Sequence, residues 1–204
     1  MKKEIEELGG LQEFEEIEEM FYPLSKYYRD YGIPMPRVEL VQPEAIPEPY
    51  RHLLVHEADM TGRLTAFHGE ALGLKVIEKH TPCSVLARRV VLYGLETNKK
   101  VEFGEIVIYL NRFQSEVRDL IEAGQIPLGG ILVEHQVGFF NSPSHYLKIV
   151  ADDMIARDLA ILTGSELYGR KNKQTNYEGE VLSEIVEILP PVEESFEEKG
   201  EVYE

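Results

Sequence analysis

The chain has 204 residues and a formal net charge of −16 at neutral pH. A chain of this length is expected to fold as one domain and to bury roughly 70% of the surface that it exposes when unfolded. The single Cys83 excludes an internal disulfide and fits a reducing compartment. No apolar run is long enough for a membrane span or a signal peptide, so we expect a cytoplasmic protein without a membrane partner.

The negative charge is concentrated at the two ends of the sequence. Residues 1–20 contain eight Glu and two Lys, and residues 193–204 contain six Glu and one Lys. These ends carry −6 and −5, which leaves −5 for all the residues between them. Because no basic stripe offsets this field, we expect no nucleic-acid partner. We divide the chain into an acidic amino-terminal helix with a Pro-rich connector (1–49), one domain (50–191) and an acidic tail (192–204).

The first predicted elements are helices. Apolar residues recur at every third position across residues 5–20, which predicts an amphipathic helix over about 11–30. This helix would pack on the domain or on a second copy of the chain, which would make a homodimer. Five prolines in residues 33–49 predict an extended connector. A second helical pattern then covers residues 50–68 and stops at Gly69.

Strand patterns dominate the rest of the sequence. Apolar and β-branched runs predict strands at 72–80, 84–93, 101–110, 167–176 and 181–189. Two short helices are predicted at 115–123 and 151–162, and residues 125–130 should turn or stay extended. Since the elements do not alternate as βαβ units, the sequence predicts a single α+β domain with a mainly antiparallel β-sheet and inserted helices.

Two charged residues lie within apolar strand patterns. Arg88 shares a strand face with Val90, and Glu187 shares one with Ile185, because side chains alternate between the faces of a strand. An unpaired buried charge is costly, so both groups should have partners. They either pair with each other or face an anionic ligand and a proton. Arg89 must point to the opposite face.

Other charged residues in the sequence could likewise be either structural or part of a ligand site. Glu184 lies three residues before Glu187, and Glu105 sits in another apolar strand, where we interpret it as structural. Arg170, Lys171 and Lys173 form a basic patch, which suits either an exposed cluster or the steering of a small anion.

We expect neither a metal nor a cofactor. His52 and His56 are spaced like half of a metal site, but the HExxH order and a third ligand are missing. Phosphate-binding glycine patterns and a serine nucleophile elbow are absent as well. Any catalysis would therefore depend on proton transfer and charge stabilisation.

Four stretches in order resemble the chorismate pyruvate-lyase family, including a branch long catalogued as a domain of unknown function. The stretches are Asp-Met-Thr-Gly-Arg at 59–63, Leu-Ala-Arg-Arg-Val-Val-Leu at 86–92, Gly-Gln-Ile-Pro-Leu-Gly at 124–129 and Leu-Tyr-Gly-Arg-Lys at 167–171. The resemblance covers residues 57–190. It implies a sheet whose inserted helices cover a buried ligand pocket.

The resemblance also implies an activity, the elimination of pyruvate from the substrate chorismate to leave the product 4-hydroxybenzoate without a cofactor. Arg88 would hold a carboxylate of the substrate, the backbone at Met60 and Leu128 would position it, and Glu187 would transfer the proton. Glu184 stays an alternative to Glu187, since the spacing from the hairpin glycine favours Glu187 and the Ser-Glu-Ile context favours Glu184.

A second hypothesis is a binding protein or sensor that holds an aromatic acid or a sugar phosphate without turnover. The same fold resembles the effector domain of a group of bacterial transcription regulators. Residues 1–49 are acidic and broken by prolines, so we do not expect a winged helix-turn-helix there. Turnover requires Glu187 or Glu184 to face Arg88 inside the pocket, whereas binding alone does not.

Overall fold

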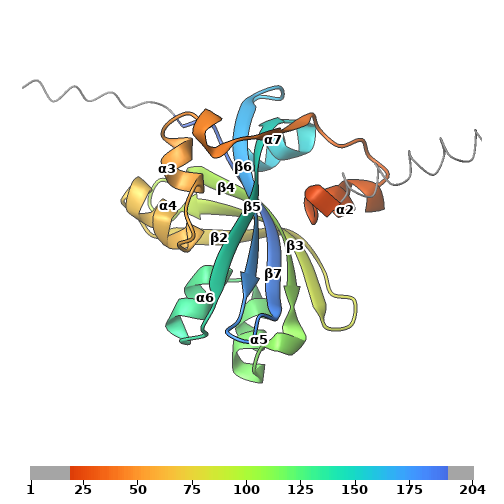
Figure 1. Cartoon of the computed structure of the whole chain (residues 1–204), viewed down its shortest axis with the longest axis vertical. Helices are drawn as coiled ribbons and strands as arrows, with labels where there is room; N and C mark the ends of the chain where they lie inside the picture. The colour runs from red at the N-terminus through yellow and green to blue at the C-terminus, as the bar shows by residue number, and fades with distance from the viewer. Residues whose placement is uncertain (1–18, 193–204) are drawn as a thin grey trace, which may run out of the picture.

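A seven-stranded antiparallel sheet forms the body of the protein, with the strand order β1-β5-β6-β7-β4-β3-β2 (Figure 1). The structure is a computed structural model, and it describes residues 19–192. The strands are β1 (Val38–Val41), β2 (Leu72–His80), β3 (Val85–Gly94), β4 (Lys100–Tyr109), β5 (Phe140–Val150), β6 (Glu166–Thr175) and β7 (Val181–Leu189). The predicted α+β domain with a mainly antiparallel sheet is confirmed.

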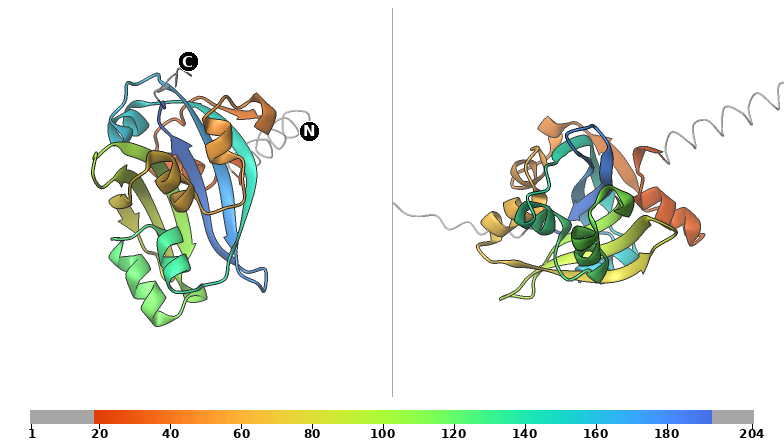
Figure 2. Two further views of the ribbon diagram at one scale, coloured as in Figure 1. Left: turned by 90° about the vertical axis from the view of Figure 1, so that its left-hand side faces the viewer. Right: turned by 90° about the horizontal axis from the view of Figure 1, so that it is seen from below.

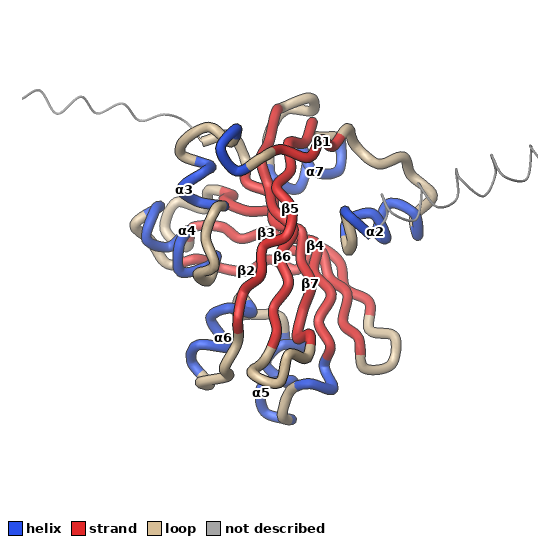
Figure 3. The backbone as a smooth tube through the Cα atoms, in the orientation of Figure 1, coloured by secondary structure: helices blue, strands red, loops and turns tan. Residues whose placement is uncertain are grey.

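Helices cover both faces of this sheet. They are α2 (Leu24–Asp30), α3 (Tyr50–Leu54), α4 (Met60–His68), α5 (Ser115–Ala123), α6 (Leu128–Glu134) and α7 (Asp153–Leu159), with short 3₁₀ turns at Pro43–Ala45 and Leu110–Arg112. In Figure 2, α5 and α6, in green, lie together beside the strand ends. Figure 3 shows α3 and α4 beside a different part of the same band of strands.

The hydrophobic core is divided by the sheet. On one face, α2 and α7 pack against Phe103, Val186 and Ile188. On the other face, α3 to α6 pack against a set of residues that includes Ile106 and Ile185. The central strands β3, β4 and β7 are therefore apolar on both sides, which explains why their sequences read as nearly continuous hydrophobic runs. A charged residue in the middle of these strands, such as Arg88, Arg89, Glu105 or Glu187, is buried whichever way it points.

The helix predicted over 50–68 is two helices, because the chain turns between α3 and α4. Asp59 caps the second helix, and its carboxylate accepts a hydrogen bond from the backbone N–H of Gly62 at 2.7 Å. Gly69 ends α4 with a positive φ of 71°. This interruption sets the start of α4 against the sheet.

Three elements were not predicted. β5 is absent from the sequence expectations, and β1 lies within the segment 33–49 that was expected to be an extended connector. α6 begins at Leu128, within the segment 125–130 that was expected to turn or stay extended, so that expectation is wrong from Leu128 onward. β1 pairs with β5 and so joins that segment to the sheet, while the domain boundaries remain a prediction. Of the helix expected over 11–30, the described part shows a turn at 21–23 followed by α2. Residues 11–18 and the acidic tail from 193 onward lie outside the described residues.

Within the described range, none of the helices is long and apolar enough to cross a membrane.

Candidate ligand-binding site

A cavity lies between the sheet and helices α4 and α6. It contains about 500 Å³ of space between atoms, including the part that opens to solvent. Its lining combines charged, amide and apolar side chains: Asp59, Met60, Thr61, Leu74, Arg88, Val90, Leu92, Glu102, Ile106, Pro127, Leu128, Gly129, Asn141, Gln174, Ile185 and Glu187. The residues predicted as site residues, Met60, Arg88, Leu128 and Glu187, all line this cavity. Their roles there remain predictions.

Arg88 projects from β3 into this cavity and is only 3% exposed. Its Nη1 donates a hydrogen bond to the carbonyl oxygen of Ile121 at 3.1 Å, near the end of α5. Its Nε is buried without a partner, and no carboxylate pairs with it anywhere in residues 19–192. Burial lowers the pKa of Arg88 to about 10, which still leaves the guanidinium charged at neutral pH. Arg88 is thus a buried cation without an anion.

Glu187 reaches the cavity from β7, and its partner is Arg170 on the adjacent strand β6. The two residues form a buried ion pair through Arg170 Nε and Glu187 Oε2, and Arg170 is completely buried. The hypothesis that Arg88 and Glu187 pair with each other is therefore wrong. The prediction of a basic patch at Arg170, Lys171 and Lys173 is also wrong for Arg170, because its side chain points into the protein.

Arg170 also holds the turn that interrupts the helical segment. Its Nη1 donates to the carbonyl oxygens of Leu54 at 3.1 Å and His56 at 2.8 Å. These carbonyls lie at the end of α3, where an α-helix leaves its last acceptors unsatisfied. One buried guanidinium thereby joins β6, β7 and the end of α3.

Glu102 is a cavity residue that the sequence did not reveal. It is 3% exposed, and its Oε2 is buried without a partner in the described part of the chain. Burial raises its pKa well above the ordinary value, and the nearby negative charge of Glu187 adds to this effect. Burial also raises the pKa of Glu187, although Arg170 opposes the shift. Two buried carboxyl groups thus share one arginine, which favours retention of a proton on Glu102.

Amide side chains form a polar wall of the cavity. Asn141 Oδ1 accepts hydrogen bonds from Asn172 at 3.0 Å and from Gln174 at 3.1 Å. Gln174 Oε1 accepts a further hydrogen bond from Ser183 at 2.8 Å. These contacts cross β5, β6 and β7, so they fix the wall to the sheet and orient its amides.

The helices that close the cavity meet where Gly129 of α6 lies against the side chain of Asp59. A Cβ atom on Gly129 would lie 1.9 Å from Asp59 Oδ1, so a larger residue at this position would displace the Asp59 side chain that caps α4. Met60 and Leu128 are the first residues of these two helices. The backbone positions that the family resemblance assigns to ligand contacts are therefore adjacent in space.

The other candidate residues lie away from the cavity. Glu184 accepts a hydrogen bond from the Tyr109 hydroxyl at 3.0 Å and lines a separate groove with Lys171 and Lys173. Of the two glutamates in β7, Glu187 is the one in the cavity. His56 binds the carbonyl of Leu53 through Nε2 at 2.7 Å. Within 19–192, no three His, Cys, Asp or Glu side chains are grouped to hold a metal ion.

Replacing Glu102 by glutamine should flatten the dependence of stability on pH. The folded protein keeps the Glu102 proton at pH values where the unfolded chain, with a pKa of 4.5, has released it. The free energy of unfolding should then fall as the pH rises above this value, by up to about 1.4 kcal/mol per pH unit. Urea unfolding of Glu102→Gln, followed by circular dichroism from about pH 5 to pH 7, should show a smaller fall than the wild type. Parallel curves would contradict the buried, protonated state of Glu102.

Comparisons with known proteins give a fold but no family. No protein-family model and no curated protein matches this sequence. The structure of PhnF from Mycobacterium smegmatis is similar with a TM-score of 0.50 and 10% identity, over 67% of this chain and 65% of that one. The effector domain of PhnF alone gives a TM-score of 0.49 and 11% identity, over 64% of this chain and 87% of that one. This chain thus spans less than two thirds of the length of PhnF.

A transcriptional regulator of the GntR family from Enterococcus faecalis V583 gives a TM-score of 0.40 and 9% identity, over 57% of this chain and 91% of that one. The shared fold with PhnF is consistent with the chorismate lyase-like fold that the motifs predicted.

The prediction that the protein is a lyase is wrong. The fold is that of PhnF, a protein that has an effector domain. The expectation that nucleic acid is not a partner stays a prediction.

Proposed function

We propose that the cavity between the sheet and helices α4 and α6 binds a small organic anion without turnover, as the ligand-sensing part of the protein. The observation that carries this proposal is Arg88, a buried guanidinium in the cavity without a carboxylate partner among the described residues. A buried charge of this kind is stable only with a counter-charge, and a ligand carboxylate or phosphate would supply it through two parallel hydrogen bonds.

The lining suggests the shape of this ligand. Arg88 stands opposite Ile106 on β4, whereas Glu102 stands opposite Leu92, so the two polar groups lie four residues apart along the strand pair. That separation is about 13 Å at ~3.3 Å per residue. Apolar side chains from the strands, among them Val90 and Ile185, line the space between them. We therefore propose a flat apolar body with an anion at the Arg88 end and a hydroxyl at the Glu102 end, as in an aromatic hydroxy acid.

The arrangement of Glu187 supports binding in preference to chemistry. Its carboxylate is already engaged by Arg170, which in turn holds the α3–α4 turn. A group that transfers protons to a substrate needs freedom to exchange them, and an ion pair with a buried arginine removes that freedom. In a sensor the same pair would keep the cavity in one shape.

The test is a calorimetric titration of the purified protein with 4-hydroxybenzoate, beside the neutral analogue 4-hydroxybenzamide. We expect saturable binding of the acid and at least tenfold weaker binding of the amide. In parallel, incubation with chorismate should release no pyruvate. Equal affinity for acid and amide would contradict an anion site at Arg88, and enzyme-dependent pyruvate would contradict binding without turnover.

A further inference from the structure

A second cavity lies on the opposite face of the sheet, between the α2 region and strands β2 to β4. It contains about 970 Å³ of space between atoms, including the part open to solvent. Tyr22, Tyr27 and Tyr31 line it from the α2 side, and Val85 and Val107 are among its apolar residues on the strands. It also includes Glu105, the strand glutamate that the sequence led us to treat as structural.

Glu105 is a buried acid without a partner. It is 6% exposed, and its Oε2 forms no hydrogen bond within residues 19–192. Burial raises its pKa to about 8, even though Arg89 lies opposite it on β3 and lowers the pKa. A core position that only needed to be filled would favour an apolar side chain over an acid that must keep its proton. The carboxyl group therefore requires an explanation beyond packing.

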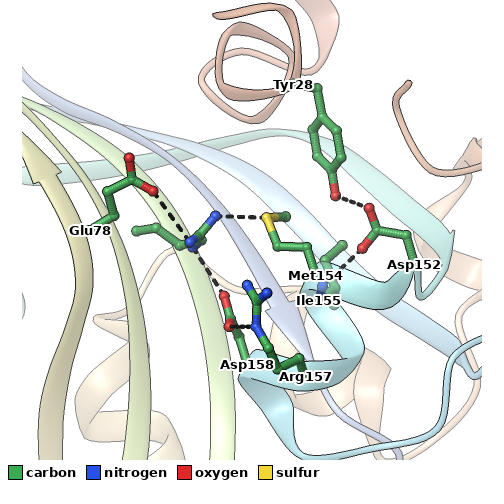
Figure 4. Close-up of polar contacts among 8 residues, drawn as sticks. Tyr28, Glu78, Asp152, Met154, Ile155, Arg157 and Asp158 are labelled. Atoms are coloured by element: carbon green, nitrogen blue, oxygen red, sulfur yellow. Dashed lines mark hydrogen bonds and ion pairs between the residues drawn. The ribbon is translucent and has the colours of Figure 1, made fainter. Parts of the chain in front are cut away.

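Arg89 does not neutralise Glu105, because other groups hold its guanidinium. Its Nε lies 3.0 Å from Asp158 Oδ2, its Nη2 lies 3.3 Å from Glu78, and its Nη1 contacts the sulfur of Met154 at 2.7 Å. Its Cζ also lies 4.6 Å from the centre of the Tyr27 ring. Glu78 and Asp158, which Figure 4 labels, each form an ion pair with Arg89. Arg89 thus already contacts two carboxylates, those of Glu78 and Asp158, and Glu105 is a third acidic group beside it.

Asp158 also pairs with Arg157, whose Nε lies 3.1 Å from Asp158 Oδ1, so Arg89 and Arg157 together balance Asp158 and Glu78. An ionised Glu105 would then be the carboxylate without a counter-charge, and a cation would supply it. No set of three metal-binding side chains occurs in the described range, so a bare metal ion is not the candidate. An organic ammonium fits better, since aromatic rings attract cations and three tyrosines line the cavity. Its apolar body would contact Val85 and Val107.

We infer that this second cavity binds a small organic cation, a primary ammonium on an apolar body, with the ammonium group at Glu105 and the body against the tyrosines of the α2 region. The site differs from the anion site proposed at Arg88, because Glu105 points to the other face of the sheet and selects the opposite charge, although Arg88 lines both cavities. The groups whose charges act on Glu105 are Arg89 from β3, Glu78 from β2 and Asp158 from α7. The other charged or titratable groups that line the cavity come from the α2 region (Tyr22, Lys26, Tyr27, Asp30 and Tyr31), from β2 (Lys79 and His80) and from β3 (Arg88).

The test uses benzylammonium as the probe and ¹⁵N-labelled full-length protein in nuclear magnetic resonance titrations at pH 7. Saturable shifts are expected for the backbone amides of Ala87, Glu105 and Val107, which belong to the lining residues. Benzyl alcohol and benzoate should not reproduce them. Glu105→Gln, which keeps the shape and removes the acid, should weaken benzylammonium binding at least tenfold. Glu116→Gln on the exposed side of α5 should leave it unchanged.

A second readout separates a direct charge contact from a change in packing. Glu105 holds its proton at pH 7 in the free protein, so pairing with an ammonium group should release close to one proton per bound ligand. Calorimetry in two buffers of different ionisation enthalpy measures this release, which should vanish in Glu105→Gln. The inference is overturned if no shifts occur at the three amides, if Glu105→Gln binds as tightly as the wild type, or if binding releases no proton. The titration with 4-hydroxybenzoate fails or succeeds independently of these results.

Discussion

Arg88→Ala should weaken the binding of 4-hydroxybenzoate by about 100-fold. Hydrogen bonds to charged groups contribute about 1.5–3 kcal/mol each, and a guanidinium holds a carboxylate through two of them. A loss of about 3 kcal/mol corresponds to a roughly 100-fold higher Kd. Isothermal titration calorimetry measures this change directly. The variant should fold, because the substitution removes a buried charge that has no carboxylate partner in the described chain.

Two further variants define what the arginine supplies. Arg88→Lys keeps a positive charge and loses the planar fork, so its affinity should lie between those of wild type and Arg88→Ala. Arg118→Ala removes an arginine from the exposed surface of α5 and should bind as the wild type does. An Arg88→Ala protein that is folded by circular dichroism and binds 4-hydroxybenzoate normally would show that the anion is held elsewhere.

Glu187→Leu should lower the free energy of unfolding by about 3–5 kcal/mol, because it removes the carboxylate that forms the ion pair with the buried Arg170. Arg170 is completely buried, and its two carbonyl acceptors at Leu54 and His56 cannot neutralise it. Urea denaturation followed by circular dichroism gives this value. An exposed pair offers the matched control, since Glu180→Leu, which removes the partner of Arg112, should cost less than 1 kcal/mol.

The double variant Glu187→Leu with Arg170→Met tests the reason for this loss. If the unpaired arginine causes the instability, its removal should restore part of the stability that Glu187→Leu loses. The recovery should be incomplete, because Arg170→Met also leaves the two carbonyls of the α3–α4 turn without their donor. Strictly additive losses in the double variant would show that the two residues do not act as a pair.

Most strands could be predicted from the sequence because each is a long hydrophobic run within one continuous segment. β2, β7 and α5 have the bounds that the patterns predicted, since periodicity and a terminal glycine suffice to place them. β5 was not predicted because its first half is polar and includes Pro143, next to which the register of its pairing with β6 shifts. α6 was not predicted because Gly129 and Gly130 disfavour a helix. The helix forms nevertheless, because it buries Leu128, Ile131 and Leu132.

The site was predictable only in part, for a related reason. Motifs placed Arg88, Met60, Leu128 and Glu187 in one pocket, and these residues do line one cavity. Their partners depend on which strands are neighbours. Arg170 meets Glu187 through the β6–β7 pairing, and Glu102 joins them from β4. In the sequence Glu102 follows two lysines of a hairpin and resembles a solvated end of a strand. Such relations between distant segments are set by topology rather than by local pattern.

The contact of Gly129 with Asp59 has a kinetic consequence. The sheet side of the cavity is closed by strands that are hydrogen-bonded to one another, so a ligand cannot pass through it without breaking several of those bonds. The helical side is held by packing between the start of α6 and the cap of α4. A bound anion would therefore leave by separation of these two helices. Its residence time should depend on how often they part, and affinity and exchange rate could be tuned by different residues of the same cavity.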